Sequence, residues 1–254
     1  MLIKLGGSVI TDKSVPYKAR TDIIKRLARG IKNSSSAPIV LAHGSGSFAH
    51  TSAQKYGGKK GYKSKWGIAK VARDAMEINR ILMDAFIEEG LPVISLRPMS
   101  MILTDSGKTK DHLFKVVEEA IKQGLIPVIY GDVIFDEDWK TTIYSGERTL
   151  NEIGLYLIKR GYKIDKIIQV GQTDGVYDDN KKTIPLITRR NWGRIKKYLY
   201  GLKANDVTGG MRHKIDNAFL MADQGIKTLI INGNKPRELI NAFYGKKFHG
   251  TLIA

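Results

Sequence analysis

The stretch MLIKLGGSVITDK, residues 1 to 13, decides the fold because a short apolar segment runs directly into two glycines. Leu2–Leu5 predicts a buried β-strand that carries Lys4, and Gly6, Gly7 and Ser8 follow as a loop. Glycine lets backbone N–H groups approach an anion without interference from a Cβ atom, and lysine supplies a positive charge. The segment therefore predicts a strand that ends in an anion-binding loop. It is not a Walker loop, since the chain contains neither GxxxxGK[ST] nor GxGxxG.

Beyond this segment, short apolar runs alternate with amphipathic stretches over the whole chain. The expected strands are Leu2–Leu5, Pro38–Ala42, Pro92–Leu96, Ile126–Tyr130, Lys166–Val170, Lys227–Ile231 and Thr251–Ile253. The expected helices are Thr21–Lys32, Gly67–Glu89, Lys110–Gln123, Thr149–Arg160, Gly210–Gln224 and Pro236–Phe243, and four of them lead into a glycine (Gly90, Gly124, Gly161, Gly225) suited to a left-handed cap. This alternation predicts an α/β fold, a three-layer αβα sandwich with a mostly parallel central sheet. Without a repeat or a low-complexity linker, residues 1–254 are expected to form one domain.

Composition limits the classes of function. With no cysteine, the chain has neither disulfides nor thiolate chemistry, which fits a cytoplasmic protein, and no apolar run is long enough for a membrane span. The 42 Lys and Arg residues against 25 Asp and Glu give a formal net charge of +17. Such a field attracts polyanions and also steers small phosphorylated substrates. The basic residues are spread in pairs such as Lys196-Lys197 rather than gathered in a tail, so nucleic-acid binding stays open only as a second class of function.

The glycine-rich segments fall after successive expected strands. Gly44–Ser47 lies inside HGSGSFAH at 43–50, Gly131-Asp132 follows the strand Ile126–Tyr130, and Gly171–Gly175 follows Lys166–Val170. Parallel sheets bind ligands beyond the carboxyl ends of their strands, so these loops are expected to meet there.

These motifs appear in a recognisable order: KLGGSVITDK at 4–13, HGSGSFAH at 43–50, YGDV at 130–133, YSGE at 144–147, TDGVYD at 173–178 and DVTGGMRHK at 206–214. The chain resembles the amino acid kinase superfamily and, within it, the archaeal type of isopentenyl phosphate kinases, which carry a histidine where this sequence has His50. The resemblance extends from Leu2 to the closing FHGTLI at 248–253.

The resemblance implies an acceptor-binding half, approximately residues 1–164, and a nucleotide-binding half, residues 165–254. It implies that ATP donates its γ-phosphoryl group to isopentenyl phosphate and that magnesium bridges the nucleotide phosphates without a dedicated protein cage. A homodimer is expected from the fold, and no membrane partner is expected. In-line transfer onto an anionic phosphate needs positioning and charge neutralisation, and it needs no general base.

Roles for individual residues follow from the resemblance alone. Lys4 and Lys214 are expected to contact the transferring phosphates, and Lys13 is expected to neutralise charge in the transition state. The nucleotide is expected at Lys4, Gly6, Gly7, Ser8, Gly46, Gln172, Asp174, Gly175, Tyr177, Gly210 and Lys214. The acceptor phosphate is expected at Ser45, Gly46, His50 and Gly146, and its hydrocarbon tail at Ile68 and Val71, with Val133 and Ile143 opposite.

His43 and His50 are expected to differ. If Ser47 opens a helix, His50 lies in the first turn and faces an anion at the helix N-terminus. His43 ends a strand, which favours a structural role, and His213 is left without an assignment.

Two positions depart from the family pattern. Ser145-Gly146-Glu147-Arg148 stands where SGDD is common, and Gln172 stands where the nucleotide loop commonly has an aspartate. Glu147 keeps a carboxylate that could organise the lysines, whereas Arg148 adds positive charge and Gln172 leaves nucleotide preference open.

Other functions remain open besides the phosphorylation of isopentenyl phosphate. A fosfomycin-type phosphonate kinase shares much of the histidine loop, and acetylglutamate, uridylate and carbamate kinases share the fold but generally lack its histidine. From a different class comes a basic nucleic-acid-binding or regulatory protein that retains a kinase fold without turnover.

Overall fold

The structure is a computed structural model that describes residues 1–33, 38–58, 61–62, 64–201 and 207–254, with the backbone alone at 57–58, 61–62, 198–201 and 207–209. Its helices are α1 (Gly7–Ile10), α2 (Thr21–Lys32), α3 (Gly46–Tyr56), α4 (Lys65–Glu88), α5 (Lys115–Lys122), α6 (Gly146–Lys159), α7 (Arg189–Gly201), α8 (Val207–Ala222) and α9 (Pro236–Phe243), with a 3₁₀ turn η1 (Pro98–Ser100). Its strands are β1 (Leu2–Leu5), β2 (Val40–His43), β3 (Gly57–Gly58), β4 (Gly61–Tyr62), β5 (Val93–Ser95), β6 (Ile102–Asp105), β7 (Lys108–His112), β8 (Ile126–Tyr130), β9 (Asp132–Asp136), β10 (Lys140–Tyr144), β11 (Lys166–Gly171), β12 (Leu186–Ile187), β13 (Lys227–Asn232) and β14 (Gly250–Ile253).

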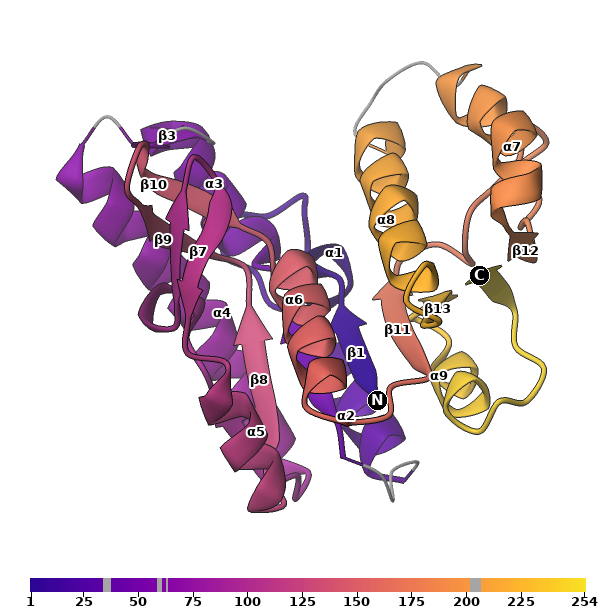
Figure 1. Cartoon of the computed structure of the whole chain (residues 1–254), viewed down its shortest axis with the longest axis horizontal. Helices are drawn as coiled ribbons and strands as arrows, with labels where there is room; N and C mark the ends of the chain where they lie inside the picture. The colour runs from indigo at the N-terminus through magenta and orange to yellow at the C-terminus, as the bar shows by residue number, and fades with distance from the viewer. Residues whose placement is uncertain (34–37, 59–60, 63, 202–206) are drawn as a thin grey trace.

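The central sheet has the strand order β12-β14-β13-β11-β1-β2-β8-β5 within the described residues. β1 lies in its middle and pairs in parallel with β11 on one side and β2 on the other. The pairs β2–β8, β5–β8 and β11–β13 are also parallel, and β14 runs antiparallel to β13. Parallel pairing brings the carboxyl ends of β1, β2, β8 and β11 to one edge, toward which the labelled arrows β1, β8 and β11 point in Figure 1.

Helices cover both faces of this sheet, which confirms the three-layer αβα sandwich. On one face, α2, α4 and α9 pack on β1, β2 and β11 through a core that includes Ile24, Leu82 and Leu239. On the other face, α5 and α6 pack on the same strands through residues such as Val117 and Ile153. A third core under α7 and α8 covers β13 and β14. Figure 1 shows the N-terminal part of the chain on the left and the orange-to-yellow C-terminal part on the right.

One expected helix begins later than its periodicity suggested. The helix predicted over Lys110–Gln123 is wrong in its first part, because residues up to His112 belong to β7 and α5 begins only at Lys115. The cause is a tight hairpin: β6 and β7 are joined through Ser106 and Gly107, whose φ angles of 49° and 74° are both positive. Such a two-residue turn matches the twist of an antiparallel pair, so turn chemistry overrides helix propensity here.

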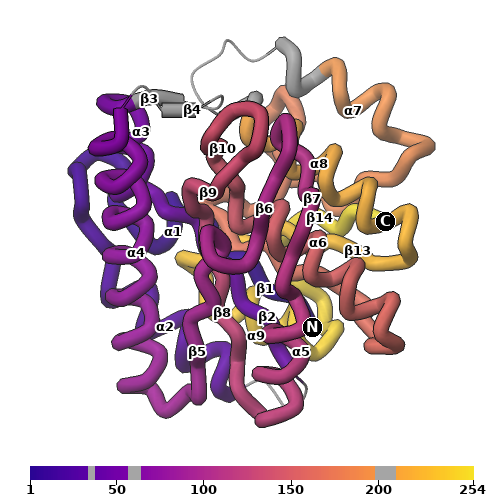
Figure 2. The backbone as a smooth tube through the Cα atoms, turned by 60° about the vertical axis from the view of Figure 1, so that its left-hand side comes forward, coloured from indigo at the N-terminus to yellow at the C-terminus, as the bar shows by residue number. Residues whose placement is uncertain are grey.

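That hairpin belongs to a second, four-stranded sheet of order β10-β9-β6-β7, which lies over α4 and η1 and was not predicted as a sheet. The tube view of Figure 2 shows its strands in front of β8 and β2. Helix α7 was not predicted either, and its sequence is rich in Arg and Lys. The four glycine caps are confirmed, since Gly90, Gly124, Gly161 and Gly225 have φ angles of 79°, 75°, 90° and 78°.

The loops after β1 and β2 touch through their backbones. A Cβ atom on Gly7 would lie 2.5 Å from the nitrogen of Gly46, and Gly46 itself has a φ angle of +50°. Thr11 joins the two loops, since its hydroxyl donates to the Gly7 carbonyl at 2.7 Å and accepts from the Ser47 N–H at 2.9 Å. Only glycine at these positions permits the approach, so the motif glycines first of all hold two loops together.

In the described part of the chain, no helix is both long and apolar enough to cross a membrane.

The close contact between the loops after β1 and β2 predicts that Gly7→Ala lowers the free energy of unfolding by about 1–3 kcal/mol. The added methyl group would overlap backbone atoms, which cannot move away as a flexible side chain could. Gly193→Ala is the matched control: Gly193 lies inside α7 with no atom near its Cβ position, so alanine should be neutral or stabilising there. Urea denaturation of both variants measures the difference. Equal stability of Gly7→Ala and the wild type would contradict the close contact.

Candidate active site

Two long helices begin at the edge where the central strands end. α3 begins at Gly46 directly after β2, and α6 begins at Gly146 after β10. A Cβ atom on Gly146 would lie 2.6 Å from the His43 carbonyl oxygen, and the Gly131 N–H donates to that same oxygen at 3.1 Å. Ser45 completes the contact, because its hydroxyl donates to the Gly131 carbonyl at 2.5 Å. The structure thus brings Ser45, Gly46 and Gly146 together, with two helix N-termini suited to an anion.

Two of the expected lysines meet beside these helix ends. Lys4 lies on β1, and its Nζ is 3.9 Å from Oε2 of Glu147 in the first turn of α6. Lys214 comes from α8 on the other half of the molecule. Burial, then the positive charge of Lys4 and, less strongly, that of Lys13, lower the pKa of Lys214 to about 8, and Glu147 opposes this shift. Lys214 is therefore held in an already positive, largely desolvated place, where a phosphate would relieve the repulsion.

Lys13 reaches the same field from a third direction. It lies on the segment between α1 and α2, with an exposed side chain, and its charge contributes to the low pKa of Lys214. Lys4, Lys13 and Lys214 thus lie close enough for their charges to interact, although more than 200 residues separate the first from the last.

Glu147 is the carboxylate nearest this group, and it is held from two sides. Besides Lys4, it contacts Asn217, whose Nδ2 donates to Oε1 at 3.1 Å. Asn217 was not predicted, although its position three residues after Lys214 on α8 places both on one helix face.

Arg148 does not add its charge to this region. Its Nε donates to Glu152 at 3.0 Å, its Nη1 donates to the Gly107 carbonyl at 2.7 Å, and its guanidinium lies 4.3 Å from the centroid of the Tyr144 ring. The guanidinium of Arg148 instead attaches α6 to the β6–β7 hairpin.

The two histidines of HGSGSFAH occupy different environments, as their positions suggested. His43 is fully buried, its Nε2 is 3.1 Å from Oδ1 of Asn79, and its ring stacks on Tyr130 at 5.5 Å. Burial lowers the pKa of His43, so its imidazole stays neutral in the core. His50 lies on the exposed side of α3, one turn after Gly46.

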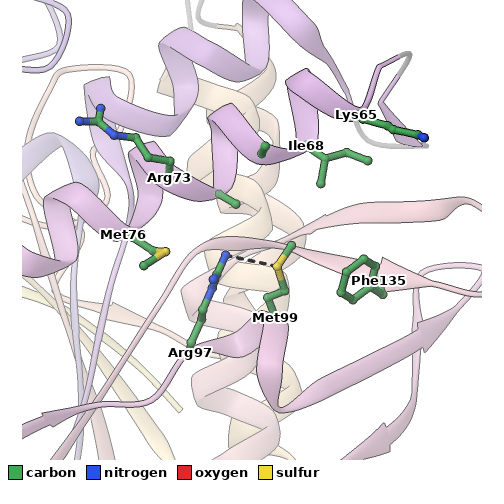
Figure 3. Close-up of a pocket in the computed structure, with 9 residues that line it drawn as sticks. Lys65, Ile68, Arg73, Met76, Arg97, Met99 and Phe135 are labelled. Carbon is green, nitrogen blue, oxygen red and sulfur yellow. Dashed lines mark hydrogen bonds between the residues drawn. The ribbon is translucent and has the colours of Figure 1, made fainter.

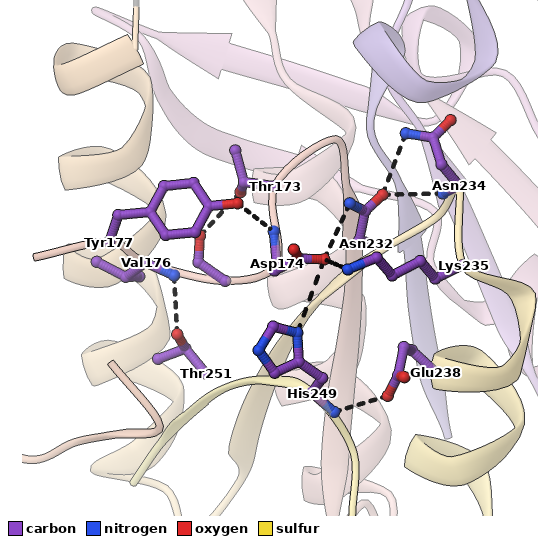
Figure 4. A network of polar contacts seen from close by, with 11 residues as sticks. Thr173, Asp174, Val176, Tyr177, Asn232, Asn234, Lys235, Glu238, His249 and Thr251 are labelled. Atoms are coloured by element: carbon purple, nitrogen blue, oxygen red, sulfur yellow. Dashed lines mark hydrogen bonds and ion pairs between the residues drawn. The ribbon is translucent and has the colours of Figure 1, made fainter. Parts of the chain in front are cut away.

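The loop after β11, at which the nucleotide is expected, is built around Asp174. Its Oδ1 accepts hydrogen bonds from Asn232 at 3.0 Å and from Lys235 at 2.7 Å, and His249 lies 3.8 Å away (Figure 4). Burial acts to raise the pKa of Asp174, but the Lys235 and Asn232 donors hold it below its ordinary value. Gly175 has a φ angle of +110° and packs against Thr251, while the Tyr177 hydroxyl accepts from the Asp174 N–H at 3.0 Å.

Gln172 connects this loop to the N-terminal one, since its amide donates to the Ser8 carbonyl. An aspartate has no donor for that bond, so the departure from the family pattern has a structural counterpart. Gly210 is exposed on α8, and Asp206, which opens the DVTGG motif, lies outside the described residues.

The two residues expected at the acceptor's tail are not in one cavity. Val71 is buried with Ala49, Ala75 and Tyr130 between α3, α4 and β8. Ile68 is half-buried and lines a separate groove of about 420 Å³ between α4, η1 and β9, where Met99 and Phe135 face it (Figure 3). Of the residues expected opposite, Val133 is buried and Ile143 is exposed. The structure thus places Ile68 on this outer groove and Val71 in the core.

Among the described residues, no group of three or more histidine, aspartate or glutamate side chains could hold a metal ion. Glu147 and Asp174 already accept from Asn217 and from Lys235, respectively.

Comparison with known proteins agrees with this geometry. The model of the amino acid kinase family matches residues 1–232. The chain is 33% identical to an isopentenyl phosphate kinase of Methanocaldococcus jannaschii over 99% of this chain and 97% of that protein. It is 31% identical to one of Methanothermobacter thermautotrophicus over 100% and 98%. A solved X-ray structure of an isopentenyl phosphate kinase superposes on this chain with a TM-score of 0.82 and 26% identity, and the match covers 100% of both chains.

The family match over residues 1–232 and full-length relatives above 30% identity lead to one conclusion: the chain belongs to the amino acid kinase family, and within it to the isopentenyl phosphate kinases.

Proposed function

We propose that this protein transfers the γ-phosphoryl group of ATP to isopentenyl phosphate and releases isopentenyl diphosphate and ADP. The observation that carries the proposal is the buried, charge-crowded Lys214 beside Lys4, at the edge where α3 and α6 begin. Positive groups that repel one another in the free protein gain most when two anionic phosphates lie between them. We infer that the acceptor binds mainly to residues 1–164 and the nucleotide mainly to residues 165–254.

The reaction needs no covalent bond between the protein and the phosphoryl group. An oxygen of the acceptor phosphate attacks the γ-phosphorus, and the bond from that phosphorus to the β–γ bridging oxygen breaks, so that ADP leaves. The N-termini of α3 and α6 hold the acceptor phosphate, and Lys4 and Lys214 hold the phosphate in transfer. Lys13 neutralises the charge that spreads over the equatorial oxygens. Gly6, Gly7, Ser8 and Gly46 carry the nucleotide phosphates.

Mg²⁺, when bound with ATP, supplies charge neutralisation between the nucleotide phosphates. The carboxylates of Glu147 and Asp174 are engaged by their neighbours, so the nucleotide oxygens and water are the ligands that we expect.

A panel of acceptors with ATP and magnesium tests this function: isopentenyl phosphate, dimethylallyl phosphate, fosfomycin, N-acetylglutamate and UMP. We expect the highest kcat/KM for isopentenyl phosphate. Preference for fosfomycin would assign the protein to phosphonate kinases, and no turnover of any acceptor would favour the non-catalytic alternative.

We also infer a homodimer. The outer face of α4 exposes Met76 and Ile87, and Phe135 of β9, which lines the outer groove together with Met76, is also exposed. A second copy would bury this apolar face, and the mass in solution, set against 28.3 kDa for one chain, tests it.

The lowered pKa of Lys214 predicts a pH dependence. Since its pKa in the folded protein is about 8, the ammonium loses its proton as pH rises through that value, and kcat/KM should fall on the alkaline side. Lys214→Arg keeps the charge at all these pH values, so the variant should be slower near neutrality but should lose the alkaline fall. A full pH profile of both proteins provides the measurement. An identical alkaline limb in Lys214→Arg would mean that another group titrates.

His50→Ala should lower turnover of isopentenyl phosphate roughly 10²-fold or more, the scale of losing one preorganised donor. His43→Asn is the internal comparison, because His43 is buried and stacks on Tyr130 away from solvent. It should reduce stability more than it reduces kcat of the folded protein. Steady-state kinetics alongside thermal melting separate the two effects, and equal catalytic losses would contradict the separate roles.

Ile68→Ala should improve use of ten-carbon geranyl phosphate relative to isopentenyl phosphate, because Ile68, which is expected at the acceptor's tail, lines the groove beside Met99 and Phe135, and the smaller alanine would widen that groove. Each additional buried methylene contributes about 0.8 kcal/mol, so a widened groove would favour the longer chain. The ratio of kcat/KM values measures the change, and Leu113→Ala, which truncates an exposed leucine, is the control. An unchanged ratio would remove Ile68 from the tail site.

A further inference from the structure

The segment that carries Lys13 is a small hairpin rather than an open loop. Thr11 and Ala19 form an antiparallel bridge, and the Asp12 N–H donates to the Lys18 carbonyl at 2.9 Å. The indigo trace of this segment runs beside α3 in Figure 2. Lys13 therefore extends from a hairpin whose position depends on what holds its tip and its base.

The tip is held on the acceptor half by Tyr17. Its ring meets Phe48 of α3 edge-on, with centroids 5.8 Å apart and planes at 88°, and the ammonium of Lys70 lies 5.5 Å from the ring centroid. Tyr17 has a φ angle of +58°, a left-handed conformation that a tyrosine adopts only when its surroundings impose it. Phe48 belongs to the HGSGSFAH motif, so the tip rests on the helix that begins at the proposed phosphate site.

Beneath Tyr17 lies Asp74 of α4, which has no exposed surface. Lys70 and Arg73 both donate to its Oδ1 at 3.1 Å, whereas its Oδ2 has no hydrogen-bond partner among the described residues. Partial burial and then the negative charge of Asp74 raise the pKa of the Tyr17 phenol, so the two groups are close. A buried carboxylate oxygen without a donor is unfavourable, and the Tyr17 hydroxyl is the donor at hand.

The base of the hairpin is held on the nucleotide half by Arg20. Its Nη2 donates to Oδ1 of Asn234 at 3.0 Å. The Nδ2 of Asn234 donates to Oδ1 of Asn232 at 3.1 Å, and Asn232 donates in turn to Asp174 (Figure 4). A continuous chain of polar contacts therefore runs from the nucleotide loop to the base of the Lys13 hairpin.

We propose that Tyr17 and Arg20 are positioning residues that fasten the Lys13 hairpin across the two halves, with the Tyr17 hydroxyl donating to Oδ2 of Asp74 when the site is assembled. The inference rests on the proposed role of Lys13 in transfer. A lysine on an unfastened hairpin would lose much of its effect, because its charge must lie on the transferring group at the moment of reaction. Because the hairpin is held at both ends, the position of Lys13 depends on both the acceptor half and the nucleotide half.

The test is a double-mutant cycle with Lys13. Tyr17→Phe keeps the ring on Phe48 and removes only the hydroxyl, and Arg20→Met removes the contact with Asn234. In the otherwise wild-type protein, each should lower kcat roughly tenfold while the KM values for ATP and isopentenyl phosphate change little. In a Lys13→Ala background, neither substitution should lower kcat further, because both act only through Lys13.

Two controls match the chemistry of the anchors. Tyr244→Phe removes another partly exposed tyrosine hydroxyl, which donates to the Asn33 carbonyl away from the site. Asp74→Asn should reproduce Tyr17→Phe without adding to it. Glu118→Gln alters another buried carboxylate, held by Lys122 and Arg160, and should leave kcat unchanged.

The outcomes distinguish the role of Lys13 in transfer from the fastening of its hairpin by Tyr17 and Arg20. Full activity of Lys13→Ala would refute the role of Lys13, and the fastening with it. A slow Lys13→Ala with a normal Tyr17→Phe, or an equal loss from Tyr17→Phe in both backgrounds, would overturn the fastening alone. Thermal melting of Tyr17→Phe within the range of Tyr244→Phe excludes a general loss of folding.

Discussion

The mutual repulsion of Lys4, Lys13 and Lys214 is the constraint on which the site depends. Burial and then the charge of Lys4 lower the pKa of Lys214 to about 8, although the carboxylate of Glu147 opposes the shift. A cluster of this kind is unfavourable in the free protein, and the fold maintains it because the lysines come from separate elements of a rigid sandwich. Two phosphates supply the missing negative charge, so the energy held in the repulsion becomes affinity for substrates and for the charge of the transition state.

Backbone contact between glycines makes this convergence possible. Gly7 against Gly46 and Gly146 against the His43 carbonyl bring the ends of β1, β2 and β8 closer than any side chain at those positions would permit. The starts of α3 and α6 follow directly. The same glycines that suggest an anion-binding loop in the sequence therefore have a packing role as well, and a change at any of them alters stability and chemistry together.

The bounds of several strands and helices could be predicted from the sequence. The strands Leu2–Leu5 and Ile126–Tyr130 and the helices Thr21–Lys32 and Pro236–Phe243 have the expected bounds, because buried apolar runs and amphipathic periods are local signals. The β6–β7 hairpin was not predicted, and the helix expected from Lys110 overlaps the end of β7. The partners of Glu147, Arg148 and Asp74 could not be read from the sequence, since they depend on which distant elements the fold brings together. The anchors of the Lys13 hairpin are of the same kind.

Proton uptake on substrate binding tests the central claim most directly. At pH 8, about half of the Lys214 side chains carry no proton, and phosphates bound between the lysines should restore it. Calorimetric titration of the protein with isopentenyl phosphate and a non-hydrolysable ATP analogue, in two buffers of different ionisation enthalpy, measures that uptake. The account predicts uptake approaching half a proton per site in the wild type and none in Lys214→Arg. Binding without proton uptake in the wild type would contradict it.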